Sequence, residues 1–298
     1  MVIILFIPIV AFLLSFIMFR PSLALSNRVG AIDFPSERKI HSQPMARAGG
    51  FSFFVSFSVC LLVSPTDPLL KSPLILGSGI VFLVGFLDDT VNLSPFIKLS
   101  GQFLALAVYH FSSELIGNEI PTFSAILISI WVIFITNAVN IIDGLDGLAG
   151  GVCCSQALCL VAISLIWGNK SILLCSLILL AAIMGFLPHN FPRAKIFMGD
   201  CGALFLGFAL AIFSSKLIID SKSIFCLLAI LLIFCVPSYD TIFSFTRRII
   251  KGKNPFRADR GHLHHRLLSC GFSKECATLM LVTISLLFGL LGIIISVI

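Results

Sequence analysis

The sequence predicts an all-α polytopic membrane protein with about ten transmembrane helices, and three observations support this fold class. First, 58% of the 298 residues are hydrophobic and only 11% are charged, whereas a soluble domain has about 25% charged residues. Second, the mean hydropathy is +1.09, so the chain cannot cover itself with polar surface in water. Third, the apolar residues form ten stretches, and the loops between them are too short for a soluble domain.

The ten stretches reach or approach the roughly 17–25 residues that a helix needs to cross a bilayer. The first lacks the basic start and the small-residue cleavage site of a signal peptide, so we expect a retained span. The third and fourth are short. In chain order the stretches are 2–19, 48–65, 73–87, 99–113, 121–138, 147–167, 171–188, 201–217, 224–243 and 276–298.

Basic residues are divided unequally between the two sides that ten spans define. Sixteen of the 20 Lys and Arg residues fall in loops of one side, and only Lys71, Lys170, Lys216 and Lys222 fall on the other. Because cytoplasmic loops carry the excess of Lys and Arg, the basic side should be cytoplasmic and both termini extracytoplasmic. The unusual polar clusters lie on the basic side, so we expect the active site there.

The most unusual cluster follows the fifth stretch, in residues 137–148. Asn137 and Asn140 are three positions apart, as are Asp143 and Asp146, and residues three apart are neighbours on a helix surface. Polar groups at membrane depth are costly and are usually retained for function. Four oxygen-bearing side chains beside glycines suit a hard cation or a phosphorylated ligand.

A second cluster places Asp88 and Asp89 at the end of the third stretch. One could bind a metal while the other meets a different group, and two close carboxylates raise one pKa, which suits a proton acceptor. The alternative is two carboxylates solvated at the interface. Lys98 and Gln102, four residues apart, could be a phosphate contact and its support, or could snorkel to the interface.

A third cluster, residues 189–200, combines basic, aromatic and acidic side chains. Asp200 could cap the helix that follows or bind a metal, and both roles are compatible. Phe197 could stack on a base or anchor the loop at the interface.

The fourth cluster is Arg260-Gly-His-Leu-His-His-Arg266. Arg and His near a carboxylate–cation site are suited to phosphate oxygens, and a zinc site is the weaker alternative. A basic loop, residues 38–50, contains Arg47 and could also attract anionic lipid headgroups. We expect Asp240 to be a buried structural partner of Arg247 or Arg248.

Together these segments resemble the polyprenyl-phosphate N-acetylhexosamine-1-phosphate transferases. That family includes the enzymes that start O-antigen, enterobacterial common antigen and wall teichoic acid synthesis, and the phospho-MurNAc-pentapeptide translocase. The Asp-Arg-Gly-His-Leu-His-His-Arg segment resembles the branch that acts on UDP-N-acetylhexosamine. The matching stretches are 85–89 with Lys98 and Gln102, 137–148, 189–208 and 259–273, with 38–50 matching more loosely.

The resemblance implies that residues 1–298 form one integral-membrane transferase domain in the bacterial cytoplasmic (inner) membrane. Its reaction would transfer a sugar-1-phosphate, with GlcNAc favoured, from a UDP-sugar to undecaprenyl phosphate with Mg²⁺ or Mn²⁺, releasing UMP. The partners implied are the UDP-N-acetylhexosamine, the lipid acceptor and membrane lipids, without nucleic acid. A homodimer is compatible with the family.

The resemblance also implies roles for individual residues. Asp200 would be the main metal ligand, with Asp89 a second ligand, and Asp88 would contact the attacking lipid phosphate. The catalytic set would comprise Asp88, Asp89, Asp143, Asp146, His262, His264 and His265. The substrate-binding set would comprise Arg47, Lys98, Asn137, Asn140, Asn190, Phe197 and Arg260.

Several alternatives stay open. The sugar could be QuiNAc or FucNAc, or the donor UDP-MurNAc-pentapeptide. An ion-coupled transporter would need ionisable residues near the bilayer midplane, whereas here they lie at predicted span ends. A CDP-alcohol phosphotransferase is suggested by Asp143-Gly and Asp146-Gly, but that family's Ala-Arg is replaced by Gly147-Leu148.

Overall fold

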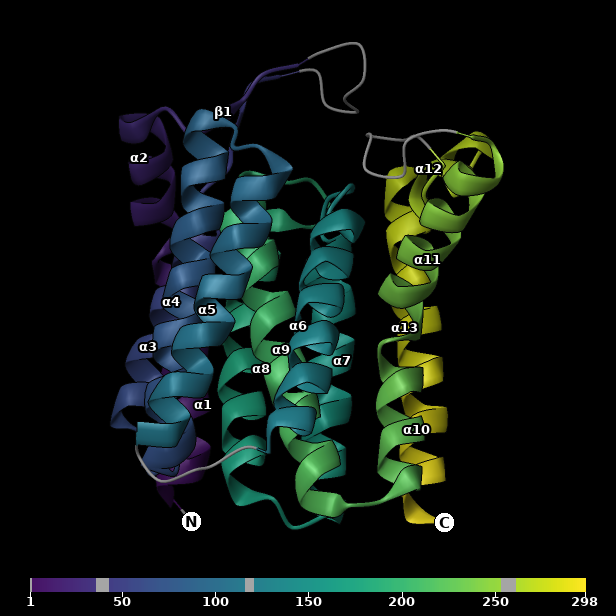
Figure 1. Ribbon diagram of the computed structural model, residues 1–298. Helices are drawn as coiled ribbons and strands as arrows, with labels where there is room; N and C mark the ends of the chain where they lie inside the picture. Colours follow the sequence, from purple (N-terminus) through teal and green to yellow (C-terminus); the bar gives the residue numbers. More distant parts are fainter. Residues whose placement is uncertain (1, 36–42, 116–120, 253–260) are drawn as a thin grey trace.

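The computed structural model describes residues 2–35, 43–115, 121–252 and 261–298, and these fold into a bundle of helices (Figure 1). The helices are α1 (Val2–Ile17), α2 (Phe19–Val29), α3 (Gly50–Val63), α4 (Pro68–Val91), α5 (Pro95–Leu115), α6 (Thr122–Ile142), α7 (Leu148–Ile166), α8 (Lys170–Asn190), α9 (Gly199–Ser221), α10 (Ile224–Ile233), α11 (Cys235–Ile250), α12 (Leu263–Ser269) and α13 (Lys274–Val297).

Each of the ten predicted apolar stretches lies largely within helix, so the all-α polytopic fold class is confirmed. Within the described residues, six helices are long and apolar enough to cross a membrane, or eight if each bent helix pair is one span. The 14-residue α3 is shorter than a usual span, and α5 is not among the six. Ten spans therefore remain a prediction.

Two of the predicted spans are bent in the structure, and the fold also includes a small sheet. The first stretch continues into α2 after a bend of 43°, and the ninth is broken at Phe234, where α11 turns from α10 by 70°. Two short strands, β1 (Ile32–Asp33) and β2 (Met45–Ala46), pair antiparallel, with Asp33 opposite Met45. An apolar run predicts that a segment is buried but not that its helix bends. Strands of two residues are too short to give a sequence pattern. Neither feature was therefore predicted.

Several helix starts are explained by their capping residues. Asp67 accepts a hydrogen bond from the amide of Leu69 ahead of α4, and Pro68 occupies the first turn, where its missing N–H costs nothing. Asn169 caps α8 and Ser273 caps α13 in the same manner. The short polar connections between apolar runs thus define where the long helices begin.

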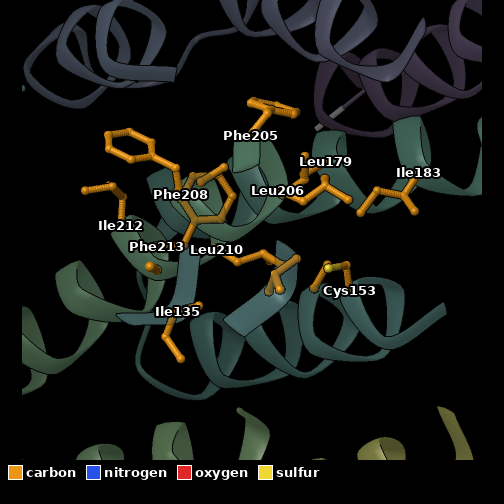
Figure 2. Packing of buried hydrophobic residues seen from close by; sticks show 14 of the residues in the cluster. Ile135, Cys153, Leu179, Ile183, Phe205, Leu206, Phe208, Leu210, Ile212 and Phe213 are labelled. Carbon is orange, nitrogen blue, oxygen red and sulfur yellow. The ribbon is translucent and has the colours of Figure 1, made fainter. Parts of the chain in front are cut away.

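Helix α9 is the centre of the bundle. In its most apolar 18-residue window 83% of the residues are buried, against 28% in α13, which therefore lies at the edge. Side chains from all around α9 pack against other helices, and Figure 2 shows Phe205, Leu206 and Phe213 of α9 among side chains of α6, α7 and α8. A helix that is hydrophobic all round is expected in such a position.

The two ends of the bundle differ. The start of α1 and the end of α13 lie at one end, and α2, β1 and α12 lie at the opposite end (Figure 1). The predicted polar clusters thus share the end that is remote from both termini.

Close backbone contact between α4 and α9 supports that polar end. A side-chain carbon on Gly85 would lie 2.5 Å from both the carbonyl oxygen of Asp200 and the Cα of Cys201. Such a distance is far inside van der Waals contact, so only glycine allows the two helices to approach this closely.

We predict that Gly85→Ala separates α4 from α9 and lowers stability by about 1–3 kcal/mol, the usual cost of overpacking. Thermal unfolding of the detergent-solubilised protein would measure this. Gly79→Ala is the matched control on the same helix, because an added carbon there meets nothing within 4 Å. Equal melting temperatures for the two variants would contradict the prediction.

Candidate active site

A cavity of about 330 Å³ opens at the end of the bundle that holds β1 and α12. Its size falls within the range of small-molecule sites. Eight of the residues predicted for the site line it, from segments far apart in the sequence: Arg47, Asp143, Asp146, Asn190, Phe197, Asp200, His264 and His265. The other lining residues include Asp33, Met45, Leu145, Met198 and Lys274.

Asp200, in the first turn of α9, connects the cavity to a charged cluster behind it. Its Oδ2 lies 2.8 Å from Nζ of Lys98, and the same Nζ lies 3.1 Å from Oδ2 of Asp88. Asp88 also accepts a hydrogen bond of 2.7 Å from the amide of Leu93. Asp88 and Lys98 do not line the described cavity, so Asp200 is the acidic residue shared by the cavity and this cluster.

Asp89 joins α4 to the start of α9. Its Oδ1 accepts a hydrogen bond of 2.9 Å from the amide of Asp200, and its Oδ2 one of 3.0 Å from the amide of Cys201. Nε of Arg47 lies 3.3 Å from Oδ1 as well. With both oxygens occupied, Asp89 is arranged to position Asp200, and its assignment as a metal ligand and catalytic group stays a prediction.

Arg47 is surrounded by carboxylates. Burial lowers the pKa of its guanidinium, but Asp89, Asp200 and Asp33 more than offset this, so the pKa is raised overall. The positive charge of Arg47 is therefore permanent at any working pH.

Residues 143–146 line one wall of the cavity. Hydrogen bonds from this segment and from Gly147 join it to the 189–200 loop and to α13. Oδ2 of Asp146 accepts a hydrogen bond of 3.0 Å from the amide of Ala194, and its backbone carbonyl accepts one from Thr278. Asn190 accepts a hydrogen bond from the amide of Gly147 and donates one to the carbonyl of Ile196. These contacts hold the wall against the 189–200 loop.

The carboxyl of Asp143 has a pKa well above its ordinary value. Burial raises its pKa to about 7, with a further contribution from the negative charge of Asp200 that Arg47 partly offsets. Near pH 7 the group therefore exchanges its proton readily, and added positive charge in the cavity would favour its ionised form.

Phe197 is fixed through its backbone. Its amide donates a hydrogen bond of 2.8 Å to the carbonyl of Ala46, and its carbonyl accepts one of 3.0 Å from the amide of Gly49. The loop that carries Phe197 is thus joined to the segment that carries Arg47, and Phe197 contributes an aromatic side chain to the cavity.

Two histidines of the fourth cluster, His264 and His265, line the cavity, whereas His262 does not. His264, which is buried, packs against Gly144 at a distance that leaves no room for a side-chain carbon. Burial lowers its pKa to about 4, helped by the neighbouring His265, so His264 is neutral at pH 7 and could contact a phosphate as a hydrogen-bonding group rather than as a cation. His265 also lines the cavity.

His262 lies behind the cavity and is held by Asp240. Its Nδ1 lies 2.9 Å from Oδ2 of Asp240, whose Oδ1 accepts a hydrogen bond of 2.7 Å from the amide of Leu263. Asp240 is thus a buried structural partner, as expected, but of the histidine segment. Arg247 instead donates a hydrogen bond to the carbonyl of Gly261.

Some predicted residues are not part of the cavity wall. Asn137 exchanges two hydrogen bonds with Gln102, of 2.7 and 3.2 Å, so Gln102 supports Asn137 rather than Lys98. Asn140 does not line the cavity. Arg260 and residues 38–42 of the basic 38–50 loop lie outside the described residues, so their predicted roles stay predictions. The roles assigned to the lining residues remain predictions.

Two charged lining residues were missed by sequence reasoning. Asp33 is an isolated acid on β1, and Lys274 begins α13. Neither belongs to a cluster or to a regular spacing. For Asp33 the available signal was the basic loop that follows it, residues 38–50, since an acid near such a loop has cationic neighbours to pair with; Lys274 gave no comparable signal.

The carboxylates fit a divalent cation that also binds substrate. Among the residues that the structure describes, no three His, Cys, Asp or Glu side chains are arranged as a complete metal site. Mg²⁺, however, is usually held by one or two carboxylates together with substrate phosphates and water. Asp200, which lines the cavity, would supply one such carboxylate.

The fold and the cavity define a polytopic helical membrane protein with a charged site at one end. A sequence profile of glycosyl transferase family 4 matches residues 72–218. The chain is 35% identical to the probable undecaprenyl-phosphate N-acetylglucosaminyl 1-phosphate transferase of Bacillus subtilis (strain 168), over 91% of this chain and 79% of that protein.

Two further relatives agree. The chain is 34% identical to the undecaprenyl-phosphate alpha-N-acetylglucosaminyl 1-phosphate transferase of Thermotoga maritima, over 94% of this chain and 87% of that protein. It is 31% identical to the decaprenyl-phosphate N-acetylglucosaminephosphotransferase of Mycolicibacterium smegmatis, over 86% and 73% respectively. The chain therefore belongs to glycosyl transferase family 4 and is a phosphoglycosyltransferase. This confirms the resemblance inferred from its motifs.

We predict that the adjacent residues Asp88 and Asp89 differ in their effect on stability. Asp89→Asn should destabilise by about 3–5 kcal/mol, because it breaks a buried charge pair and sets its NH₂ group against one of the two backbone N–H donors. Asp88→Asn should cost much less, since an amide oxygen can still accept from Leu93. Thermal unfolding of both solubilised variants checks this. A greater loss for Asp88→Asn would contradict the assignment of Asp89 as the link to α9.

Proposed function

We propose that this chain transfers N-acetylglucosamine-1-phosphate from UDP-GlcNAc to undecaprenyl phosphate, releasing UMP and forming a lipid-linked sugar diphosphate. The observation that carries the proposal is the cavity, which gathers eight of the residues implied by the family resemblance from four separate segments. The names of the relatives support the same reaction. The lipid product would start synthesis of a cell-envelope polysaccharide such as O-antigen or teichoic acid.

The reaction brings an anionic phosphate nucleophile toward a diphosphate, so it needs positive charge at the site of attack. A divalent cation, Mg²⁺ or Mn²⁺, would supply this charge by binding diphosphate oxygens, and Asp200 would be its main protein ligand. Lys98 lies between Asp200 and Asp88 and would stabilise phosphate charge. Asp88 would meet the acceptor phosphate and take its proton.

The cavity suits the nucleotide sugar. Phe197 presents an aromatic side chain that could stack on uracil, and Asn190 holds the 189–200 loop to Gly147. Asp143 and Asp146 would accept hydrogen bonds from sugar or ribose hydroxyls. His264 and His265 would contact the diphosphate from the α12 side.

The same proposal includes ten spans, a bacterial inner-membrane location and a cytoplasmic site. The observations that support it are the basic residues at the cavity end and the placement of both termini at the other end (Figure 1). A UDP-sugar is a cytoplasmic metabolite class, so a donor cavity on that side is consistent with the chemistry.

We predict that purified protein incubated with UDP-GlcNAc, undecaprenyl phosphate and Mg²⁺ releases UMP, and that EDTA stops the release. Coupled detection of UMP is the measurement. Asp200→Asn, shown by size-exclusion chromatography to be intact, should lose at least about 100-fold in turnover, the scale of losing a principal electrostatic group. Absence of UMP with every UDP-N-acetylhexosamine tested would refute the proposal.

We predict that Cys270 is accessible from the cytoplasm. It is the exposed cysteine of the ten and lies in the turn after α12, at the cavity end. A membrane-impermeant maleimide should label it in inverted membrane vesicles and leave it unlabelled in intact spheroplasts. Cys270→Ser should remove the label. Labelling in intact spheroplasts would reverse the proposed orientation.

A further inference from the structure

Asp33 is an acid that lines the cavity and lies outside the four polar clusters. It lies on β1, and its side chain is 13% exposed. Its Oδ1 lies 3.6 Å from Nη1 of Arg47. It therefore belongs to the group of carboxylates around that guanidinium.

Arg47 is shared among three acids from three different elements. Its Nε lies 3.3 Å from Asp89 of α4, its Nη2 lies 3.6 Å from Asp200 of α9, and its Nη1 lies 3.6 Å from Asp33 of β1. Asp89 is fixed by two backbone amides, so the Nε contact is anchored. The two terminal nitrogens point to Asp33 and Asp200, which share the remaining positive charge.

The backbone holds Asp33 beside Arg47 independently of the charged contact. Asp33 pairs with Met45 in the β1–β2 register, and the amide of Arg47 donates a hydrogen bond of 2.9 Å to the carbonyl of Ala31. The next amide, of Ala48, donates one of 2.9 Å to Oγ of Ser26 on α2. The backbone thus keeps Asp33 within reach of the guanidinium whatever the state of Asp200.

A divalent cation and Arg47 would compete for Asp200. Both are positive, and like charges a few ångströms apart in a partly buried site repel strongly. If the guanidinium yields Asp200, its Nε keeps the contact with Asp89, but its terminal nitrogens need another carboxylate within reach. Asp33 is that carboxylate, and its contact is as long as that of Asp200, so a small rotation of the side chain would shift the balance.

We propose that Asp33 is a positioning residue that takes up the guanidinium of Arg47 when Asp200 binds a divalent cation, and so raises the affinity of the site for the cation. This rests on the proposed metal-dependent transfer. Asp33 acts through Arg47 and need not touch the substrate. Its removal would leave Arg47 bound to Asp200 as a built-in competitor of the metal.

The test is direct binding of Mn²⁺ to the purified full-length protein without substrates, followed by electron paramagnetic resonance of the free ion. Asp33→Asn should weaken Mn²⁺ binding about tenfold, within the coupling range of contacting charged residues. Asp33→Glu, which keeps the charge, should recover most of the affinity. Glu275→Gln removes an acid in the first turn of α13 away from the cavity wall and should leave Mn²⁺ affinity unchanged.

A double-mutant cycle separates action through Arg47 from a direct effect of charge. In an Arg47→Gln background, Asp33→Asn should change Mn²⁺ affinity by less than about twofold, because the competitor is already absent. An additive, undiminished effect would overturn the proposal, as would normal Mn²⁺ affinity in a folded Asp33→Asn variant. Melting temperatures of all variants identify any that are misfolded, and the Asp33→Glu variant then decides the matter.

The outcomes also distinguish this inference from the proposed function. UMP release by the wild type with unaltered Mn²⁺ binding in Asp33→Asn would sustain the transferase and reject the role of Asp33. If instead Mn²⁺ binding depends on Asp33 but the protein releases no UMP, the role of Asp33 is sustained and the proposed transferase reaction is rejected.

Discussion

The arrangement of the site depends on one interaction, the carboxylate of Asp89 on the two amides that open α9. It joins the end of one long helix to the beginning of the most deeply buried helix, at a point where Gly85 allows backbone to touch backbone. Asp200 follows directly, so its carboxylate is directed by this junction. A helix start also favours nearby negative charge, which helps to retain two acids in so small a volume.

Charge balance is the second constraint. Asp33, Asp88, Asp89 and Asp200 are compensated by Arg47 and Lys98, which lie on different sides of Asp200. Among the described residues that line the cavity, the four acids Asp33, Asp143, Asp146 and Asp200 outnumber Arg47 and Lys274. The elevated pKa of Asp143 reflects both its burial and this excess. Such a site is arranged for a ligand that brings positive charge along with its phosphates.

Much of this could be predicted from the sequence, because hydropathy determines which segments become helices in a membrane protein. The ten apolar stretches correspond to helices, and the four polar clusters meet at one end. Which face of a helix meets the site could not be predicted: Asn137 points to Gln102, whereas Asp146 reaches the 189–200 loop. Asp33 and Lys274 were missed because contact across the fold, rather than spacing along the chain, places them there.

The 70° turn between α10 and α11 has a consequence for how the histidine segment is held. Beyond the turn, α11 keeps Asp240 and Ser244 inside and exposes Tyr239, Ile242 and Ile249, the reverse of a water-soluble amphipathic helix. Its outward face needs a hydrocarbon environment, so lipid chains contact α11 on that side. The Asp240–His262 contact holds the opposite side of the same helix. The surrounding bilayer is in this sense a structural partner of the catalytic end, and its thickness and composition become variables of the enzyme itself.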